Sequence, residues 1–253
     1  MKTLYLTWQD PKDRSWLPVG QLSFDGDVYQ FVYTKGALKS PNFIPFGRML
    51  DLHALYTSRE LFPLFANRLL PKTRPEYKAF LGWLNLQNSE DDPLELLGRS
   101  EGTRVTDSLT VFPCPEKSSD GIYDIHFFSH GLRYLPDCAV QVVEKLSHGA
   151  RLFLMQDLQN PYDAYALALR TDDPVTIVGY CPRYLSKDFL FLLKSGTPDT
   201  LQVLVERVNS DAPIQLRLLC NLRAPWLEGF VPCSGEDYEV LASPRHTADS
   251  LLH

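Results

Sequence analysis

The chain has 253 residues, of which 44% are apolar and 22% are charged, a composition typical of a folded protein with one large or two ordinary domains. Its net charge of −6 excludes a protein that coats nucleic acid by charge alone, because such proteins are basic. No apolar run reaches the roughly 18 residues that a membrane-spanning helix needs, so we expect no membrane contact.

The distribution of charged residues and cysteines along the chain further narrows the class of protein. Residues 1–115 contain 13 acidic and 13 basic side chains, so the excess of negative charge lies in residues 116–253. Any nucleic-acid binding by the second half must therefore come from a local site. The five cysteines are odd in number and widely spaced, which favours reduced thiols in a cytoplasmic protein over a disulfide framework.

The first half begins with β-rich sequence and continues into helices. Two β-rich runs flank Asp25 and Gly26, which predicts a hairpin. Thr57 and Glu60 have the spacing of a capping box in front of a helical apolar pattern. Pro63 lies inside that pattern, so the helix is expected to kink or to begin there.

Two more helices and a linker complete the first half. A helix is expected over residues 74–86, with Pro75 near its first position. A short helix follows, with Asp92 as its N-cap and Gly98 as its stop. Residues 114–121 (CPEKSSDG) have the composition of a linker.

The second half reads mostly as strands. Helical patterns occur at residues 139–149 and 186–196. The β-rich runs lie at residues 122–129, 150–157, 164–169, 175–180, 201–208 and 213–222. Several short strands with few helices indicate a small barrel-like domain. We therefore predict an α+β protein with two domains, residues 1–115 and 121–240, and a flexible tail over 241–253.

The motifs of metal and enzyme chemistry are weak. His126 and His130 are four residues apart, as helical zinc ligands are, but they lie in an alternating β-rich run. Cys181 precedes a proline in a turn and reads as a small, half-buried side chain, since the sequence locates no base beside it. There is no P-loop and no GxSxG motif. We expect no catalytic residues, no metal and no cofactor.

Aromatic and charged residues occur together at three places in the second half. The pairs are Arg133 with Tyr134, Tyr162 with Asp163, and Tyr180 with Arg183. Tyrosines can stack on bases and arginines can hold phosphates, while a carboxylate suits a free hydroxyl end. Each pair also has an ordinary structural interpretation, because an Asp in such a turn most often bonds the turn's own amides.

The order of these motifs resembles a HIRAN domain. The segments GLRYLP, NPYDAYALAL and TIVGYCPRYLS carry the resemblance, which covers about residues 121–222. It implies an OB-like β-barrel fold that binds the 3′-hydroxyl end of single-stranded DNA. By the same resemblance Tyr134 and Tyr162 stack on the terminal base, and Asp163 accepts a hydrogen bond from the 3′-hydroxyl. Asn160 fixes the turn or touches the base.

The resemblance also implies roles for the remaining candidates. Arg133 and Arg183 would hold phosphates, with Arg183 standing where the family has Lys. Tyr180 would join the DNA-binding site, although it stands where a well-characterised member has His, which leaves its role open.

The first half is similar to the N-terminal subdomain of HipA-type kinases. The resemblance covers residues 1–115 and is carried by VGQLSFDGDVYQFVYTKGAL, NFIPFGRML, ELFPLFANRLLP and DPLELLGRSEGTRVTDSLTVFPCP. The kinase core does not follow in this sequence, so kinase activity is not implied.

Two functions remain open from the sequence. One is a bacterial, non-enzymatic protein that recognises 3′ single-stranded DNA ends and uses its N-terminal domain to bind a partner protein. The alternative is a toxin–antitoxin or phage-defence component that binds a partner such as a HipA-like kinase or a toxin, without binding DNA. In the alternative, the NPYD turn is purely structural.

Overall fold

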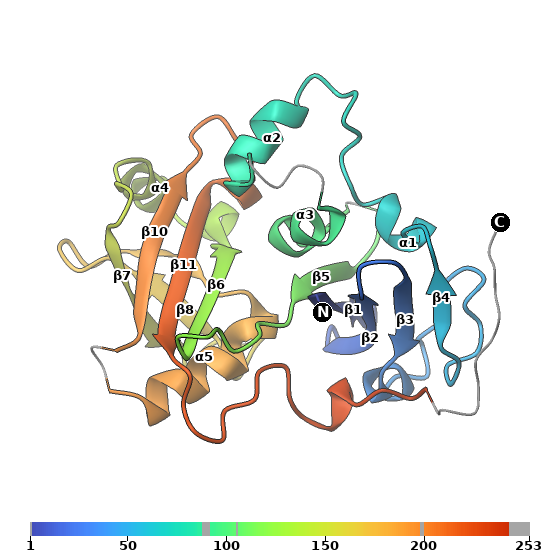
Figure 1. Ribbon diagram of the computed structural model, residues 1–253. Coiled ribbons are helices and arrows are strands. Elements are labelled where there is room, and N and C mark those ends of the chain that lie inside the picture. Colours follow the sequence, from blue (N-terminus) through green and yellow to red (C-terminus); the bar gives the residue numbers. More distant parts are fainter. Residues whose placement is uncertain (1, 88–91, 105, 198–199, 243–253) are drawn as a thin grey trace. The chain divides into compact units, whose positions relative to one another are not determined.

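The structure, a computed structural model, describes residues 2–87, 92–104, 106–197 and 200–242 (Figure 1). The chain divides into two compact units. The first comprises the described residues within Met1–Tyr77, Asn88–Cys114 and Cys233–His253. The second comprises those within Lys78–Gln87 and Pro115–Pro232.

The first unit is built on a five-stranded antiparallel sheet with the order β4-β3-β2-β1-β5. Its strands are β1 (Lys2–Gln9), β2 (Trp16–Phe24), β3 (Tyr29–Tyr33), β4 (Tyr56–Ser58) and β5 (Leu109–Pro113). The hairpin predicted around Asp25 is confirmed, since Asp25 Oδ1 accepts from the amides of Asp27 and Val28 between β2 and β3. Phe31, Phe62 and Phe65 fill the core of this unit.

The helices of the first unit differ in detail from the sequence prediction. The prediction of a capping box at Thr57 is wrong, because Thr57 lies in β4 and pairs with Gln30 of β3. The helix that follows, α1 (Pro63–Ala66), is a single turn with Pro63 at its first position. The 3₁₀ turn η1 (Lys35–Leu38) follows β3.

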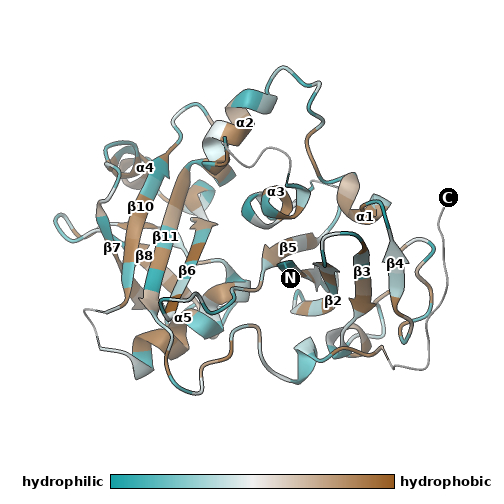
Figure 2. Cartoon of the chain, viewed as in Figure 1, coloured by the Kyte–Doolittle hydropathy of each residue, from teal (hydrophilic) through white to brown (hydrophobic). Residues whose placement is uncertain are grey.

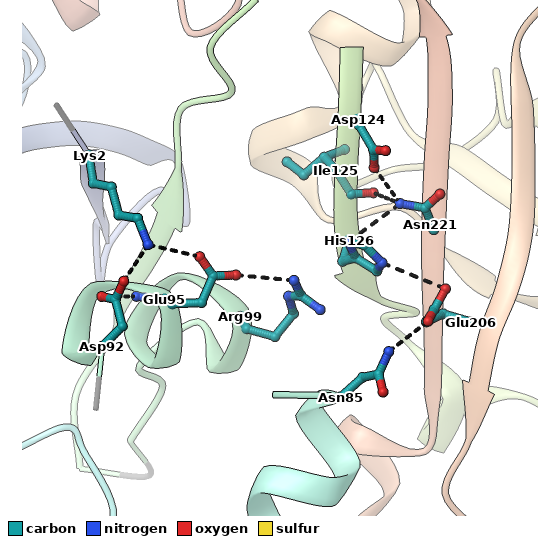
Figure 3. A network of polar contacts seen from close by, with 10 residues as sticks. All are labelled: Lys2, Asn85, Asp92, Glu95, Arg99, Asp124, Ile125, His126, Glu206 and Asn221. Carbon is teal, nitrogen blue, oxygen red and sulfur yellow. Dashed lines mark hydrogen bonds and ion pairs between the residues drawn. The ribbon is translucent and has the colours of Figure 1, made fainter. Parts of the chain in front are cut away.

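Helix α3 (Pro93–Ser100) confirms Asp92 as an N-cap, because its carboxylate accepts from the amides of Leu94 and Glu95. The predicted stop at Gly98 is wrong, since the helix continues to Ser100 and ends at Glu101 in the left-handed conformation. Lys2 of β1 forms ion pairs with Asp92 and Glu95, and Arg99 pairs with Glu95 (Figure 3). These contacts tie α3 to the sheet.

The second unit is built on a curled, six-stranded antiparallel sheet with the order β6-β11-β10-β7-β8-β9. Its strands are β6 (Ile122–Phe128), β7 (Arg151–Gln156), β8 (Leu167–Arg170), β9 (Ile177–Tyr180), β10 (Gln202–Val208) and β11 (Leu218–Pro225). The two outer strands approach each other, because His130, just after β6, pairs with Tyr180 at the end of β9. The curl therefore brings the two edge strands of the sheet, β6 and β9, toward each other.

Helix α5 (Arg183–Ser195) packs against the inside of this sheet and supplies much of its core. Phe189 is fully buried and meets Tyr123 and Phe127 of β6, with ring centroids 6.4 and 5.3 Å away. Figure 2 shows both teal and brown along β10, whose side chains alternate between buried and more exposed. The helix begins at Arg183, three residues before the helical pattern expected from residue 186, so Arg183 has a helical position.

The remaining elements of the second unit are short. They are α4 (Asp137–Glu144), α2 (Tyr77–Leu84), and the 3₁₀ turns η2 (Leu132–Tyr134) and η3 (Ile214–Leu216). Helix α2 confirms a helix within the expected range 74–86, and Pro75 lies two residues before its first residue, Tyr77.

The residue ranges of the two units differ from the domain ranges expected from the sequence. Helix α2, expected in the first domain, contacts the second sheet: Trp83 Nε1 donates to Asp211 (3.1 Å) and Asn85 Nδ2 to Glu206 (2.6 Å) (Figure 3). The segment after Cys233, expected in the second domain, belongs to the first unit. This segment includes the turn η4 (Glu236–Tyr238).

Specific contacts hold that C-terminal segment. Lys35 forms an ion pair with Glu239 (2.6 Å), and Leu241 N donates to Tyr33 O (2.8 Å). Leu241 of the expected tail is therefore held by β3, and residues 243–253 lie outside the described part of the chain. In the described residues, no helix combines the length and apolar character needed to cross a bilayer.

Candidate nucleic-acid interface

The NPYD turn is organised by the side chain of its asparagine. Asn160 Oδ1 accepts hydrogen bonds from the backbone amides of Tyr162 (3.0 Å) and Asp163 (3.1 Å). This is the local side-chain-to-backbone bonding that makes Asn favourable in turns. Asn160 therefore fixes the turn, which is one of the two roles expected for it.

Asp157 secures this turn to the rest of the unit. Its Oδ2 accepts from Asn160 Nδ2 (3.2 Å) and from the Tyr180 hydroxyl (3.1 Å). Its backbone amide donates to Ala166 O (2.9 Å), which closes the loop between β7 and β8. The sequence reasoning did not select Asp157, although its position three residues before Asn160 is typical of a turn-closing Asp.

The hydroxyl of Tyr180 also contacts this loop, through its hydrogen bond to Asp157. Burial raises the pKa of its hydroxyl above the usual value, and the hydrogen bond to Asp157 raises it further, so the group stays protonated as a donor. Tyr180 is only partly exposed. Its position supports a role in holding the loop.

The turn presents Tyr162 to solvent and keeps Asp163 mostly covered. Tyr162 is 82% exposed, so its ring is accessible to a ligand. Asp163 Oδ1 accepts from the amide of Tyr165 (2.9 Å), and Oδ2 lies 3.4 Å from Arg183 Nε. Arg183 Nη2 also donates to Tyr162 O (2.7 Å).

Arg183 thus spans the carboxylate and the backbone of the turn. A guanidinium carries five N–H donors, and these two contacts occupy two of them. Its side chain remains about one-third exposed. The arrangement partly neutralises Asp163 and places a cation beside Tyr162, at the start of α5.

Arg133 and Tyr134 form a second exposed pair on η2. Arg133 Cζ lies 4.7 Å from the centroid of the Tyr134 ring, and Arg133 Nη2 donates to the Tyr134 hydroxyl (2.7 Å). The Tyr134 side chain is 76% exposed. In the described part of the chain these two residues contact each other rather than the NPYD turn.

Paired backbone bonds connect η2 to the NPYD side of the unit. His130 N donates to Tyr180 O (2.8 Å) and Tyr180 N donates to His130 O (2.9 Å). Gly131, which follows, has φ 77° and leads directly into η2. The chain of contacts from His130 through Tyr180 to Asp157 therefore links the two exposed tyrosine segments.

This link depends on Gly179. Its φ is +121°, and a Cβ there would lie 1.8 Å from Ser129 Oγ and 2.8 Å from His130 O. Ser129 Oγ in turn donates to Val178 O (2.9 Å). Only glycine permits the approach of β9 to the segment after β6.

The structure also locates the other residues that the sequence singled out. His126 lies 3.6 Å from Glu206 and 3.4 Å from Asn221 Nδ2 (Figure 3). Within the described residues, no group of three or more His, Cys, Asp or Glu side chains is arranged to hold a metal ion. Cys181 is buried, more deeply than expected, and burial raises the pKa of its thiol well above the usual value.

Comparison with known families matches residues 122–226 to the HIRAN domain. This part of the chain is a HIRAN domain. HIRAN domains bind DNA. The match includes β6 through β11 and all seven residues that the sequence resemblance had selected, and it ends before the C-terminal segment.

Two solved structures are similar to the HIRAN domain region. A protein from Lactobacillus plantarum is 23% identical, with a TM-score of 0.32, over 41% of this chain and 96% of that one. The HIRAN domain of human HLTF is 14% identical, with a TM-score of 0.30, over 42% of this chain and 80% of that one. Curated proteins gave no match to this chain.

The close approach at Gly179 gives a testable consequence. Gly179→Ala should lower the free energy of unfolding of the HIRAN domain by about 2–4 kcal/mol, because the new Cβ adds overpacking to a positive φ. Urea denaturation of the full chain measures this cost. The matched control is Gly149→Ala, which has φ +79° but no atom within 4 Å of the added Cβ.

The control should lose only about 1 kcal/mol, the cost of the backbone conformation alone. Equal losses in the two variants would show that the approach of β9 to His130 is not the constraint.

Proposed function

We propose that the HIRAN domain of this chain binds the 3′-hydroxyl end of single-stranded DNA and that the chain is a non-enzymatic end-binding protein. The observation that carries the proposal is the NPYD turn itself. It places a highly exposed Tyr162 beside a carboxylate that is held between Tyr165 N and Arg183. A stacking platform, a hydroxyl acceptor and a phosphate-binding cation therefore lie together, the first two on the turn and the third at the start of α5.

The chemistry of each group suits a strand end. Tyr162 and Tyr134 offer flat faces on which a base can stack, and such stacking is tolerant of sequence. Arg183 and Arg133 can attract the phosphates that follow the terminal nucleotide. Asp163 can accept a hydrogen bond from a hydroxyl, whereas it repels a terminal phosphate. In this proposal Asn160 and Tyr180 position the turn.

Stacking by Tyr162 can be measured with a fluorescently labelled oligonucleotide. Tyr162→Ala should weaken binding of a 3′-hydroxyl strand by about 1–3 kcal/mol, the usual contribution of one aromatic platform. Tyr162→Phe is the matched control, because it keeps the ring and should bind nearly as well as the wild type. Unchanged affinity of the alanine variant in anisotropy titrations would exclude stacking by this ring.

The role of Asp163 predicts a preference between two strand ends. The wild-type protein should bind a 3′-hydroxyl strand more tightly than the same strand with a 3′-phosphate. Asp163→Asn removes the charge with little change of shape, so the ratio of the two affinities should fall toward one. Competition titrations with the two strands measure this ratio.

The control for this experiment is Asp172→Asn, which removes a carboxylate from an exposed position elsewhere in the domain. It should retain the wild-type ratio. Equal affinity of the wild-type protein for both ends would contradict end recognition.

We also propose that the first unit binds a partner protein, such as a HipA-like kinase or a toxin. Leu38, Ile44 and Leu50 lie in one segment, and their side chains are 55%, 77% and 69% exposed. A contiguous patch of exposed apolar side chains is typical of a protein-binding surface, and we propose that these three contribute to one. The HipA-type resemblance of residues 1–115 supports the same class of partner and stays a prediction.

An affinity capture from the native host tests this second part. Ile44→Asp combined with Leu50→Asp should abolish capture of the partner and leave DNA affinity unchanged. Val175→Asp is the control, because Val175 is also 69% exposed but lies in the HIRAN domain. If the double variant captures the same proteins as the wild type, this segment is not the partner surface. Capture of a kinase without any DNA binding would favour the toxin–antitoxin alternative.

A further inference from the structure

An open depression lies on one side of α5, outside the residues assigned to the terminal nucleotide. It has a volume of about 240 Å³ and is lined by Tyr165, Lys187, Leu190, Phe191, Lys194 and Ser195. All of these residues belong to the HIRAN domain. None of them was selected as a candidate site residue from the sequence.

The depression combines apolar surface with positive charge. Tyr165 and Phe191 are 45% and 42% exposed, although rings of this size are usually covered. Phe191 is held by stacking on Phe230, with centroids 5.3 Å apart, and Lys187 Nζ lies 5.2 Å from the centroid of Tyr165. Two lysines and no carboxylate occur among the residues that line it. An anionic occupant with flat apolar groups fits this surface.

The depression is linked to the NPYD turn through Tyr165. The amide of Tyr165 donates to Asp163 Oδ1, so the aromatic wall follows the carboxylate by two residues. Arg183 and Lys187 are four residues apart on α5 and therefore lie on one face of the helix. Lys194 continues this direction, and the distance along the axis from Arg183 is about 16 Å.

That length accommodates several nucleotides, since a stacked strand advances about 3.4 Å per nucleotide. A strand whose terminal nucleotide lies at Tyr162 and Asp163 must leave the turn in some direction. The series Arg183, Lys187 and Lys194 is a line of cations in a domain region of net negative charge. Basic side chains interleaved with aromatic rings are the usual surface for single-stranded nucleic acid.

We propose that this depression is a second subsite, which holds the nucleotides on the 5′ side of the terminal one. Bases contact Tyr165 and Phe191, and Lys187 and Lys194 contact phosphates. The proposal rests on the proposed function, because it assigns the path of the same strand. It predicts that affinity rises with strand length beyond the single terminal nucleotide that the turn holds.

The test compares thymidine 5′-monophosphate, which supplies the terminal nucleotide alone, with dT10 that ends in a 3′-hydroxyl, on the full chain and on the double variant Lys187→Ala/Lys194→Ala. For dT10, loss of two phosphate contacts should reduce the slope of log affinity against log salt by about 1.4. A tenfold increase in salt should therefore cost the wild type about 25-fold more affinity than the variant. For thymidine 5′-monophosphate, the variant should match the wild type, which also shows that the variant is folded.

Lys145→Ala is the matched control, because Lys145 is exposed on the same domain at the end of α4. It should leave the dT10 slope unchanged. The inference is overturned if the double variant keeps the wild-type slope with dT10, or if Lys145→Ala lowers the slope equally. A preference for 3′-hydroxyl over 3′-phosphate that survives in those cases would leave the proposed function intact. Loss of that preference in the wild type would instead overturn the proposed function.

Discussion

The two backbone hydrogen bonds between His130 and Tyr180 are the constraint on which the candidate interface depends. They join segments fifty residues apart and bring the ends of the curled sheet together. The approach is so close that only glycine fits at position 179, because any Cβ there would collide with Ser129 and His130. Because Tyr180 also bonds Asp157, the same contact that closes the sheet positions the NPYD loop. Fold and site are therefore one network, and a change in β9 should affect both.

The electrostatics of the chain favour a local site over general attraction. The half that contains the HIRAN domain carries the whole net charge of −6, so a phosphate backbone is not drawn to it over long distances. The contacts that matter are short: Arg183 faces Asp163 and Tyr162, and Arg133 covers the ring of Tyr134. Contacts of this length are shorter than the screening distance of about 8 Å at physiological salt, so these charges act locally.

Much of the second unit could be predicted from sequence, because its strands alternate clearly and its turns carry Asn, Asp, Pro and Gly. The NPYD turn, the helix after Cys181 and the strands β10 and β11 all follow from such patterns. Helix α2 belongs to the second unit and the C-terminal segment to the first, which is the reverse of the expectation. This assignment could not be predicted, because it rests on single long-range contacts such as that of Asn85 with Glu206. The depression on α5 was also missed, since Tyr165 and Lys187 are neighbours only in space.

The claim that the two exposed tyrosine segments form one DNA-end site is tested most directly by amide chemical shifts. A titration of the ¹⁵N-labelled chain with a short 3′-hydroxyl strand should shift the amides of residues 133–134, 160–163 and 183 most strongly. The same strand with a 3′-phosphate should produce smaller changes at Tyr162 and Asp163. The account is contradicted if the largest shifts lie elsewhere in the chain, or if the two strands give the same shifts at the NPYD turn.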